Sequence, residues 1–141
     1  MTDCVFCRIV AGEVPAHFVL QDDETVAFLD ARPVFKGHLL VAPRQHHETL
    51  ADLPPAAVGP LFQRVRLLSA AVPAALGAQG TFVAVNNVVS QSVPHLHAHV
   101  VPRTKGDGLR GFFWPRQRYA SEDEAAEYAR RIRDAVASVA A

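Results

Sequence analysis

The 141-residue chain has few of the features that mark several broad classes of protein. It has no net charge, because fourteen Lys and Arg balance fourteen Asp and Glu. A broad electrostatic footprint for nucleic acid or an anionic membrane surface is therefore not expected. No apolar stretch approaches the roughly 20 residues that a membrane-spanning helix needs. With only two cysteines, a disulfide-stapled scaffold is not expected either. We predict a protein that binds neither nucleic acid nor membrane.

The length and the first residues of the chain suggest a single cytoplasmic domain. A chain of 141 residues can bury about two thirds of its unfolded surface in one core, so we expect one domain over residues 1–141. The opening residues 1–4 lack the positive region and apolar run of a signal peptide. We therefore expect a cytoplasmic location.

The only two cysteines, Cys4 and Cys7, form a Cys-x-x-Cys pair. With no secretion signal, a structural disulfide is not expected. A redox dithiol usually opens a helix that follows a strand, and the three residues before Cys4 leave no room for that strand. The spacing favours half of a metal site over a redox pair or a pair with no special role.

The pattern of apolar residues predicts an α+β fold with a mostly antiparallel β-sheet, a long central helix and a C-terminal helix. The expected strands cover 18–21, 25–29, 38–42, 81–85 and 95–101, with a hairpin turn at 22–24. Three helices are expected, over 4–12, over a central segment and over 122–139. The central helix would begin at 53–55 after an Asp52 cap, and Pro73 would kink or end it. The last helix would follow a capping box of Ser121 and Glu124. In the last helix, we expect a buried stripe of Ala125, Ala129, Ile132, Val136 and Val139.

Three histidines alternate with apolar residues between His95 and Val101. On a β-strand, this alternation places His95, His97 and His99 on one face and the apolar residues on the other. Imidazole has an ordinary pKa near 6.5, so its neutral, nucleophilic form dominates at pH 7. Three such rings can share the tasks of phosphoryl transfer, which are attack, stabilisation of the phosphate oxygens and help for the leaving group.

The histidine run resembles the signature of the histidine-triad (HIT) superfamily, in which three histidines alternate with apolar residues and two apolar residues follow. The segments 4–15, 26–30, 37–43 and 91–93 resemble the same family, and its bacterial Hint-like members, in the same order. One departure is Ser90, which stands where many members have a glycine. The resemblance implies a HIT-like fold and a nucleotide hydrolase or transferase. Its substrate would be a purine nucleotide derivative of AMP or GMP, such as a nucleoside 5'-phosphoramidate.

The resemblance also implies roles for individual residues. His97 would be the nucleophile that forms a nucleotidyl-histidine intermediate, with its other ring nitrogen donating to a backbone carbonyl. His99 would bond the phosphate, and Ser92 would serve the phosphate and the leaving group. The remaining nucleotide-binding residues would be Asp30 at the ribose hydroxyls, Asn86 and Gln91 near the phosphate, and His38 beside the site.

A zinc site needs two ligands in addition to Cys4 and Cys7, and the residues offer His46 or His47 together with one histidine of the run. Similarity to bacterial members and to galactose-1-phosphate uridylyltransferases implies the set Cys4, Cys7, His46 and His95. Such a zinc would be structural and would not be required for the chemistry.

Several alternatives remain at this point. Within the superfamily, the protein could be a dinucleoside polyphosphate hydrolase of the diadenosine tetraphosphate type. Outside catalysis, it could be a regulatory protein that only binds nucleotides. A metalloenzyme holding one metal with all three histidines is less favoured, because alternate strand positions give only two convenient ligands.

The resemblance also implies an oligomeric state. Members of this branch are usually homodimers, and we expect the same here. The segment 112–116, which contains Trp114, would either cover the core or reach the partner's active site. In the second case Arg116 and Arg118 would meet the distal part of the substrate.

Overall fold

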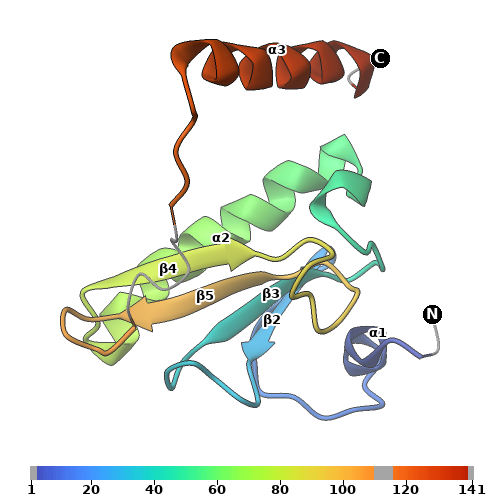
Figure 1. The fold of residues 1–141 in the computed structure, drawn as a ribbon. Coiled ribbons are helices and arrows are strands. Elements are labelled where there is room, and N and C mark those ends of the chain that lie inside the picture. Colours follow the sequence, from blue (N-terminus) through green and yellow to red (C-terminus); the bar gives the residue numbers. More distant parts are fainter. Residues whose placement is uncertain (1–2, 110–115, 140–141) are drawn as a thin grey trace. The chain divides into compact units, whose positions relative to one another are not determined.

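The computed structural model describes residues 3–109 and 116–139 (Figure 1). The chain divides into two compact units, Met1–Asp107 and Gly108–Ala141. The expectation of one domain over residues 1–141 stays a prediction. The segment with Trp114 lies outside the described residues. No helix in the described part of the chain combines the length and the apolar character that a membrane span requires.

A five-stranded antiparallel sheet forms the centre of the first unit, with the strand order β1-β2-β3-β5-β4. Together with the helices, it confirms the predicted α+β class. The strands are β1 Phe18–Gln21, β2 Thr25–Leu29, β3 Leu39–Pro43, β4 Gly80–Val85 and β5 Ala98–Arg103. The predicted hairpin turn between β1 and β2 is present, and the Oδ1 atom of Asp22 accepts the N–H groups of Glu24 and Thr25.

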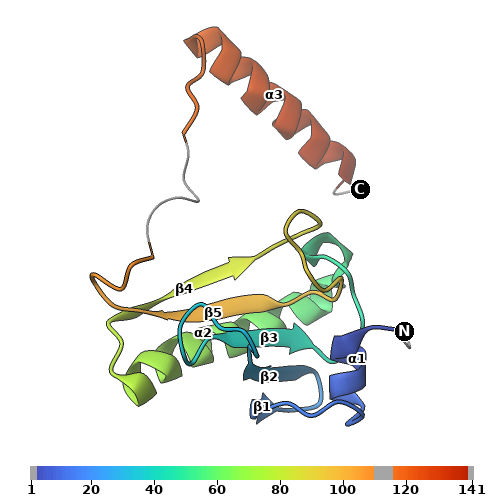
Figure 2. The same ribbon diagram turned by 60° about the horizontal axis from the view of Figure 1, so that its bottom comes forward.

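The long helix α2 (Pro55–Leu76) covers one face of this sheet and runs behind the strands in both ribbon views (Figures 1 and 2). Side chains at helical spacing on one face of α2 are buried against alternate side chains of the central strands. Each fully buried aliphatic side chain contributes about 2 kcal/mol. The buried helix residues are Leu61, Val65, Leu68 and Val72.

The short helix α1 (Val5–Val10) packs on the other face of the sheet. Its buried residues Phe6 and Ile9 join a second apolar cluster with Phe28 and Leu40 of the strands. Six residues are too few for a stable isolated helix, so α1 depends on this packing. Cys4 caps it, because the Sγ atom accepts the N–H of Cys7.

The central helix differs from the expectation at both ends. Asp52 belongs to a separate 3-10 turn (Leu50–Asp52), where it forms a capping box with Thr49, and α2 begins after Pro54. Pro73 lies inside α2, which continues to Leu76 and ends at Gly77 with φ of 71°. The left-handed conformation of Gly77, not the proline, terminates the helix.

The strand with the histidines also begins later than expected. His95 and His97 precede β5, which starts at Ala98. The reason is hydrogen bonding, because the N–H of Leu96 donates to the carbonyl of His47 in a loop and the N–H of His95 donates to Val93. The prediction of a strand over 95–101 is therefore wrong for its first three residues.

In the second unit, α3 spans Glu122–Val139, as predicted. The Ser121 hydroxyl accepts the N–H of Glu124, and the Glu124 carboxylate accepts the N–H of Ala120. In the expected capping box, the Glu124 carboxylate would accept the N–H of Ser121, so the observed donor, Ala120, lies one residue earlier. No described residue of α3 is buried, so the second unit by itself does not bury the predicted apolar stripe.

Candidate active site and metal centre

The three histidines of the run all lie on the side of the sheet that α1 covers, although only His99 belongs to a strand. The ring of Phe6 in α1 contacts the rings of His95 and His97, with centroid distances of 5.7 Å and 5.0 Å. The His97 and His99 rings are also 5.0 Å apart. His95 and His97 are buried, whereas His99 is half-buried. The predicted shared face therefore holds for the three rings.

The ring nitrogens of His97 have distinct roles that follow from one hydrogen bond. Its Nδ1 lies 2.7 Å from the backbone carbonyl oxygen of His95. A carbonyl can only accept, so Nδ1 carries the proton and donates. In the neutral ring, Nε2 then has the free lone pair. His97 is thus held as the tautomer that a nucleophile attacking through Nε2 requires.

A second chain of hydrogen bonds sets the tautomers of His38 and His99. The backbone N–H of Val34 donates to Nδ1 of His38 at 3.1 Å, so the proton of the neutral His38 ring lies on Nε2. That Nε2 is 2.9 Å from Nδ1 of His99. His99 therefore accepts at Nδ1 and carries its own proton on Nε2, where it can donate to a phosphate oxygen or a bridging atom.

Burial keeps both of these rings uncharged. Desolvation is the main cause of the lowered pKa of His99, which is about 4; the neighbouring His97 and His38 contribute to this lowering, and Asp30 opposes it. Desolvation also lowers the pKa of His38, against the opposing effect of Asp30. The carboxylate of Asp30 lies 3.7 Å from Nε2 of His38. At pH 7 His38 and His99 are therefore neutral imidazoles that donate and accept hydrogen bonds.

Cys4, Cys7, His46 and His95 bring four possible ligand atoms together within 4.8 Å of one another. Sγ of Cys4 and Nδ1 of His95 are 3.4 Å apart, as are Sγ of Cys7 and Nδ1 of His46, and Cys7 to His95 is 3.6 Å. Zinc bond lengths and a tetrahedral angle give a sulfur-to-nitrogen separation of about 3.5 Å. The four residues named from the sequence thus converge with the spacing of a zinc centre.

The protonation of His95 fits a metal ligand. Its Nε2 lies 2.8 Å from the carbonyl oxygen of Pro43 and must donate, which leaves the Nδ1 lone pair facing the cysteines. Burial lowers the pKa of His95 to about 4, so the ring is neutral. Burial raises the pKa of Cys7, and the neighbouring Cys4 adds to this effect. A bound cation would remove that cost by stabilising the thiolate.

Asp30, His38 and His99 form another group with converging ligand atoms, but their hydrogen bonds do not suit a metal. A metal on Nε2 of His38 needs the ring proton on Nδ1, and that nitrogen already accepts the N–H of Val34. The short contact between His38 and His99 is explained by one shared proton. The geometry of this group is therefore that of a hydrogen-bonded chain of neutral rings.

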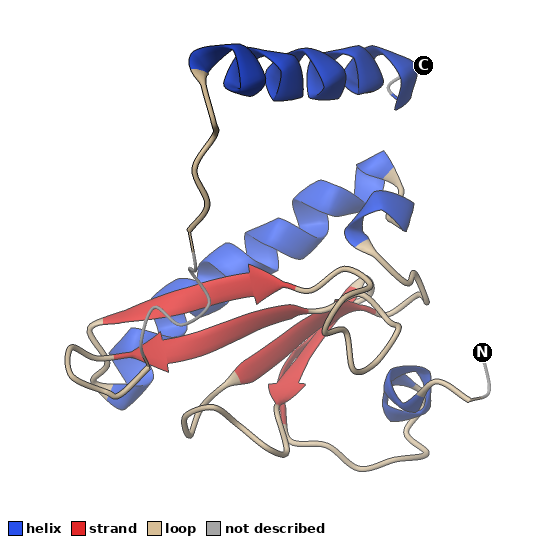
Figure 3. Cartoon of the chain, viewed as in Figure 1, coloured by secondary structure: helices blue, strands red, loops and turns tan. Residues whose placement is uncertain are grey.

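The loop between β4 and β5 positions the predicted phosphate-binding residues (Figure 3). Both ends of the Gln91 amide are engaged, because Oε1 accepts the N–H of Val88 and Nε2 donates to the carbonyl of Glu48. The Asn87 side chain accepts the N–H of Leu50. These two hydrogen bonds of the Gln91 side chain hold the loop in its conformation. The predicted contact of Gln91 with the nucleotide stays a prediction.

The other predicted nucleotide ligands lie at the ends of strands. Asp30 follows β2 and accepts the N–H of Arg32 through Oδ1. Asn86 follows β4 and is half-buried, and Ser92 is exposed before the histidines. Asp30 is tied to the histidines through His38, whereas the contacts of the described residues do not connect Asn86 directly to them.

Comparison with known proteins identifies the family. Residues 11–106 match the family model described as the HIT domain. The chain belongs to the HIT family. A solved zinc-bound HIT protein from Mycobacterium smegmatis is 36% identical, with a TM-score of 0.74 over 89% of each chain. This match confirms the predicted HIT-like fold.

Two curated relatives of this HIT protein have named activities. The adenylylsulfatase HINT3 of Arabidopsis thaliana is 38% identical over 109 residues, which are 76% of this chain and 55% of the plant protein. The adenosine 5'-monophosphoramidase hnt1 of Schizosaccharomyces pombe is 31% identical over 114 residues, which are 79% of this chain and 83% of the yeast protein. Both names thus describe enzymes of adenylyl or adenosine 5'-monophosphate chemistry.

The sequence analysis expected His97 to donate to a backbone carbonyl, and the structure shows this bond to His95, but the backbone groups that set the tautomers of His38 and His95 were missed. The N–H of Val34 and the carbonyl of Pro43 each determine which nitrogen of a histidine carries the proton. Neither group depends on the side chain of its residue, so no residue type signals it. The contact of Phe6 with His97 was also missed, although an aromatic residue between the two cysteines could have indicated it.

Proposed function

We propose that this HIT protein hydrolyses a nucleoside 5'-phosphoramidate, with His97 as the nucleophile. The observation that carries the proposal is the hydrogen bond from Nδ1 of His97 to the His95 carbonyl, which leaves Nε2 free to attack. The two curated relatives with named activities, an adenylylsulfatase and a monophosphoramidase, support a nucleotide substrate. We infer a purine nucleotide derivative of AMP or GMP.

The proposed reaction has two steps that balance. Nε2 of His97 attacks the α-phosphorus, and the bond between phosphorus and the leaving nitrogen breaks. The electron pair of that bond stays on the nitrogen, which takes up one proton from solvent and leaves as an amine. Water then attacks the nucleotidyl-histidine and gives one proton back to solvent, which releases the nucleoside monophosphate and restores neutral His97.

The neighbouring residues would stabilise the charge that develops on the phosphate. The Nε2–H of His99 would donate to a phosphate oxygen or to the bridging atom, and its orientation depends on His38. The Ser92 hydroxyl would contact the phosphate and the leaving group. The carboxylate of Asp30 would accept the ribose hydroxyls, and Asn86 and Gln91 would lie along the phosphate.

We also propose that Cys4, Cys7, His46 and His95 hold a structural zinc ion. A closed set of four ligands leaves no position for water or substrate, so the ion would connect α1 to the segment before β5. The distances between the ligand atoms support this role. None of the chemical steps above passes through the ion.

Two further expectations belong to this proposal. We propose a homodimer, because β4 is an edge strand of the sheet in the first unit and its Val83 is 40% exposed. We also propose that the protein acts in the cytoplasm.

Hydrolysis of a dinucleoside polyphosphate remains a second candidate function, because the plant relative, an adenylylsulfatase, is not named for a phosphoramidate substrate. Binding of a nucleotide without hydrolysis is the third candidate function.

One experiment separates these functions. The wild-type protein and His97→Ala are incubated with adenosine 5'-phosphoramidate and with diadenosine tetraphosphate in the presence of a chelator. We expect the wild type to turn over the phosphoramidate and the variant to lose this activity by at least about a thousandfold. Preference for the dinucleotide would favour the second candidate. Equal turnover by both proteins would overturn the role of His97.

A further inference from the structure

A cavity of about 280 Å³ lies on the face of the sheet that α2 covers. Its walls come from the turn before β2, from the end of β3 with the residues that follow it, and from the first two turns of α2. We call it the α2 cavity. None of the three histidines of the run lines it, because their rings lie on the side of the sheet that α1 covers.

Thr25 lies in the wall of the α2 cavity at the first position of β2. Side chains alternate along a strand, so Thr25 shares the face of Ala27, whereas Val26 points to the other face. Ala27 packs in the apolar cluster of α2, and Val26 packs in that of α1. The Thr25 side chain is therefore enclosed between the sheet and α2, and Thr25 is only 1% exposed.

The hydroxyl of Thr25 has no hydrogen-bond partner among the described residues. The side chain of Asp22 bonds only the backbone N–H of Thr25. Ser69 is the one described residue whose buried hydroxyl lacks both a partner and contact with solvent, so the Thr25 hydroxyl keeps its small exposure at the cavity. A hydroxyl this deeply buried is costly without a partner, and a ligand in the cavity would provide one.

Arg44 supplies further donors to the same cavity. It follows Pro43, which pairs with Thr25 between β3 and β2, and it is half-buried in the cavity wall. Its Nη1 donates to the backbone carbonyl of Asp22 at 3.2 Å. The Asp22 carboxylate pairs with Arg64 instead, and Arg44 has no ion pair with any described residue. A guanidinium has five N–H donors and no acceptor, so its remaining donors suit a carboxylate.

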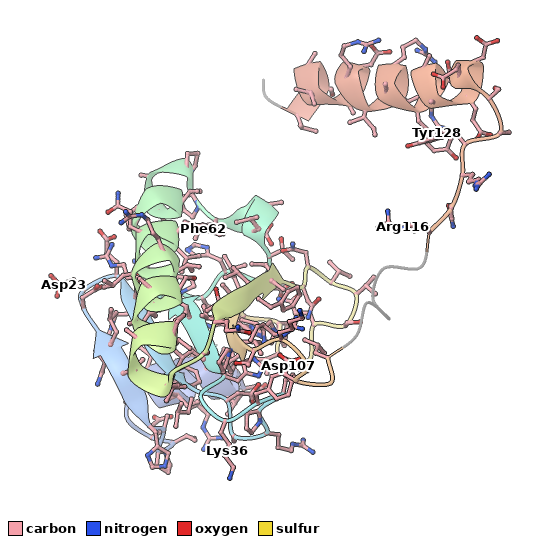
Figure 4. The ribbon with its side chains drawn as sticks, turned by 90° about the vertical axis from the view of Figure 1, so that its left-hand side faces the viewer. Asp23, Lys36, Phe62, Asp107, Arg116 and Tyr128 are labelled. Atoms are coloured by element: carbon pink, nitrogen blue, oxygen red, sulfur yellow. The ribbon has the colours of Figure 1, made fainter. Side chains whose placement is uncertain are left out.

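The rest of the wall favours a small ligand with an apolar body and a single charge. Pro43, Pro60 and Leu61 contribute hydrocarbon surface, and the volume lies below the roughly 300–1,000 Å³ of sites for drug-sized molecules. Asp23 and Glu24 are exposed at the open side of the cavity, and Figure 4 shows Asp23 at the outer edge of the first unit. Their charges disfavour a ligand with more than one negative charge.

Backbone hydrogen bonds hold this wall in place. The carbonyl of Pro43 lies 2.8 Å from Nε2 of His95, and the carbonyl of His47, another lining residue, accepts the N–H of Leu96 at 2.7 Å. A wall that is already ordered reduces the conformational entropy that binding would cost.

We propose that the α2 cavity binds a small aliphatic monocarboxylate. The carboxylate would accept hydrogen bonds from the Thr25 hydroxyl and the Arg44 guanidinium, and the aliphatic body would lie on Pro43, Pro60 and Leu61. The charged donor distinguishes this ligand from a neutral alcohol, and the apolar wall distinguishes it from inorganic phosphate. The site lies apart from the candidate active site and does not depend on the proposed hydrolysis.

The test titrates butanoate, 1-butanol and inorganic phosphate into the ¹⁵N-labelled protein at constant ionic strength and pH 7. The amide signals of residues 24–25, 44–47 and 56–61 report binding. We expect these signals to saturate with butanoate at a Kd of about 1–10 mM, as suits so small a ligand. The other two compounds should bind at least about fivefold more weakly. No saturation with butanoate, or equal or tighter binding of either other compound, overturns the proposal.

Two variants assign the contacts. Thr25→Val and Arg44→Gln should each weaken butanoate binding by about fivefold or more. Arg66→Gln is the matched control, because it removes the same charge from an exposed position of α2 outside the cavity, and it should keep the wild-type Kd. Equal loss in Arg66→Gln, or no loss in the first two variants, overturns the assigned contacts.

The stability of Thr25→Val without ligand is a further check. Valine has nearly the shape of threonine, so the urea midpoint of this variant should equal or exceed that of the wild type if the hydroxyl has no partner. A clearly lower midpoint would show that the hydroxyl is already bonded within the protein and would overturn the proposal.

Discussion

Val88 has a backbone conformation that β-branched residues rarely adopt. Its φ is 69°, and that of the nearby Ser90 is 62°. A left-handed β-branched residue costs about 1–3 kcal/mol and persists only where its surroundings impose it. Here Gln91 holds the N–H of Val88, while Asn87 ties the loop to Leu50. The loop before the three histidines is thus strained, and side-chain hydrogen bonds hold it in this conformation.

Replacement of Val88 by glycine should relieve this strain. We expect Val88→Gly to increase the free energy of unfolding by about 1 kcal/mol, because strain relief exceeds the greater entropy of the unfolded chain. Urea unfolding measures the change. Val89→Gly is the matched control, since Val89 is similarly exposed and does not have a positive φ. It should lower stability by about 0.5–1 kcal/mol. A loss of the same size in both variants would contradict the assignment of strain to Val88.

The lowered pKa of His99 predicts how stability depends on pH. Its pKa is about 4 in the folded protein and near 6.5 in the unfolded chain. Between these values only the unfolded chain binds the proton, so the contribution of His99 is complete above pH 6.5 and is lost as pH falls toward 4.

The variant His99→Asn removes this titration and retains an acceptor for His38. With chelator present, the wild type should lose more free energy of unfolding than His99→Asn between pH 7 and pH 4.5. Urea titrations at the two pH values measure both losses. Equal losses would show that His99 is not responsible.

At the level of elements, α1 is the helix that the proposed zinc ion would affect most. Cys4 both caps this six-residue helix and offers one of the four candidate ligand atoms. Serine is also a good cap, so Cys4→Ser separates the two roles. We expect this variant to lose the zinc-dependent increase in stability. That increase should be about 3 kcal/mol in the wild type when free zinc is a hundred times its Kd.

Hydrogen exchange locates the effect of this substitution. The amides of residues 5–10 should exchange faster in Cys4→Ser than in the zinc-loaded wild type, and at a rate similar to that of the chelated wild type. Gln45→Ser offers a control near His46, because Gln45 does not belong to the cluster. Unchanged exchange after zinc removal would contradict the proposed link between the ion and α1.

The sequence predicted the elements well where local patterns determine them. The hairpin strands, α3 and the helix spacing of α2 follow from turn residues and from apolar periodicity. The start of β5 could not be predicted, because the bond from Leu96 to His47 joins residues distant in the sequence. Similarly, the residue types at 95–99 indicated the candidate histidines, whereas the tautomers of His95 and His99 depend on backbone atoms of Pro43 and, through His38, of Val34.

On the scale of the whole molecule, we expect only one of the two edge strands of the sheet to form an interface between copies. We expect the wild type to be a dimer by light scattering, with β4 at the interface. Val83→Lys should produce a monomer, because a charge on β4 would oppose pairing between copies. Val19→Lys on the other edge, where Val19 is 52% exposed, should remain a dimer. A monomeric wild type would exclude this interface.

The two roles of His95 have an evolutionary consequence. Its ring faces the cysteines, but the group that orients His97 is its backbone carbonyl. Every amino acid has that carbonyl, so a substitution at position 95 can remove the candidate metal ligand and leave the hydrogen bond to His97 in place. Under the proposed roles, loss of the ion and loss of catalysis are therefore separate mutational events. A lineage of this fold that used both would be able to discard the metal one residue at a time while its chemistry remained under selection.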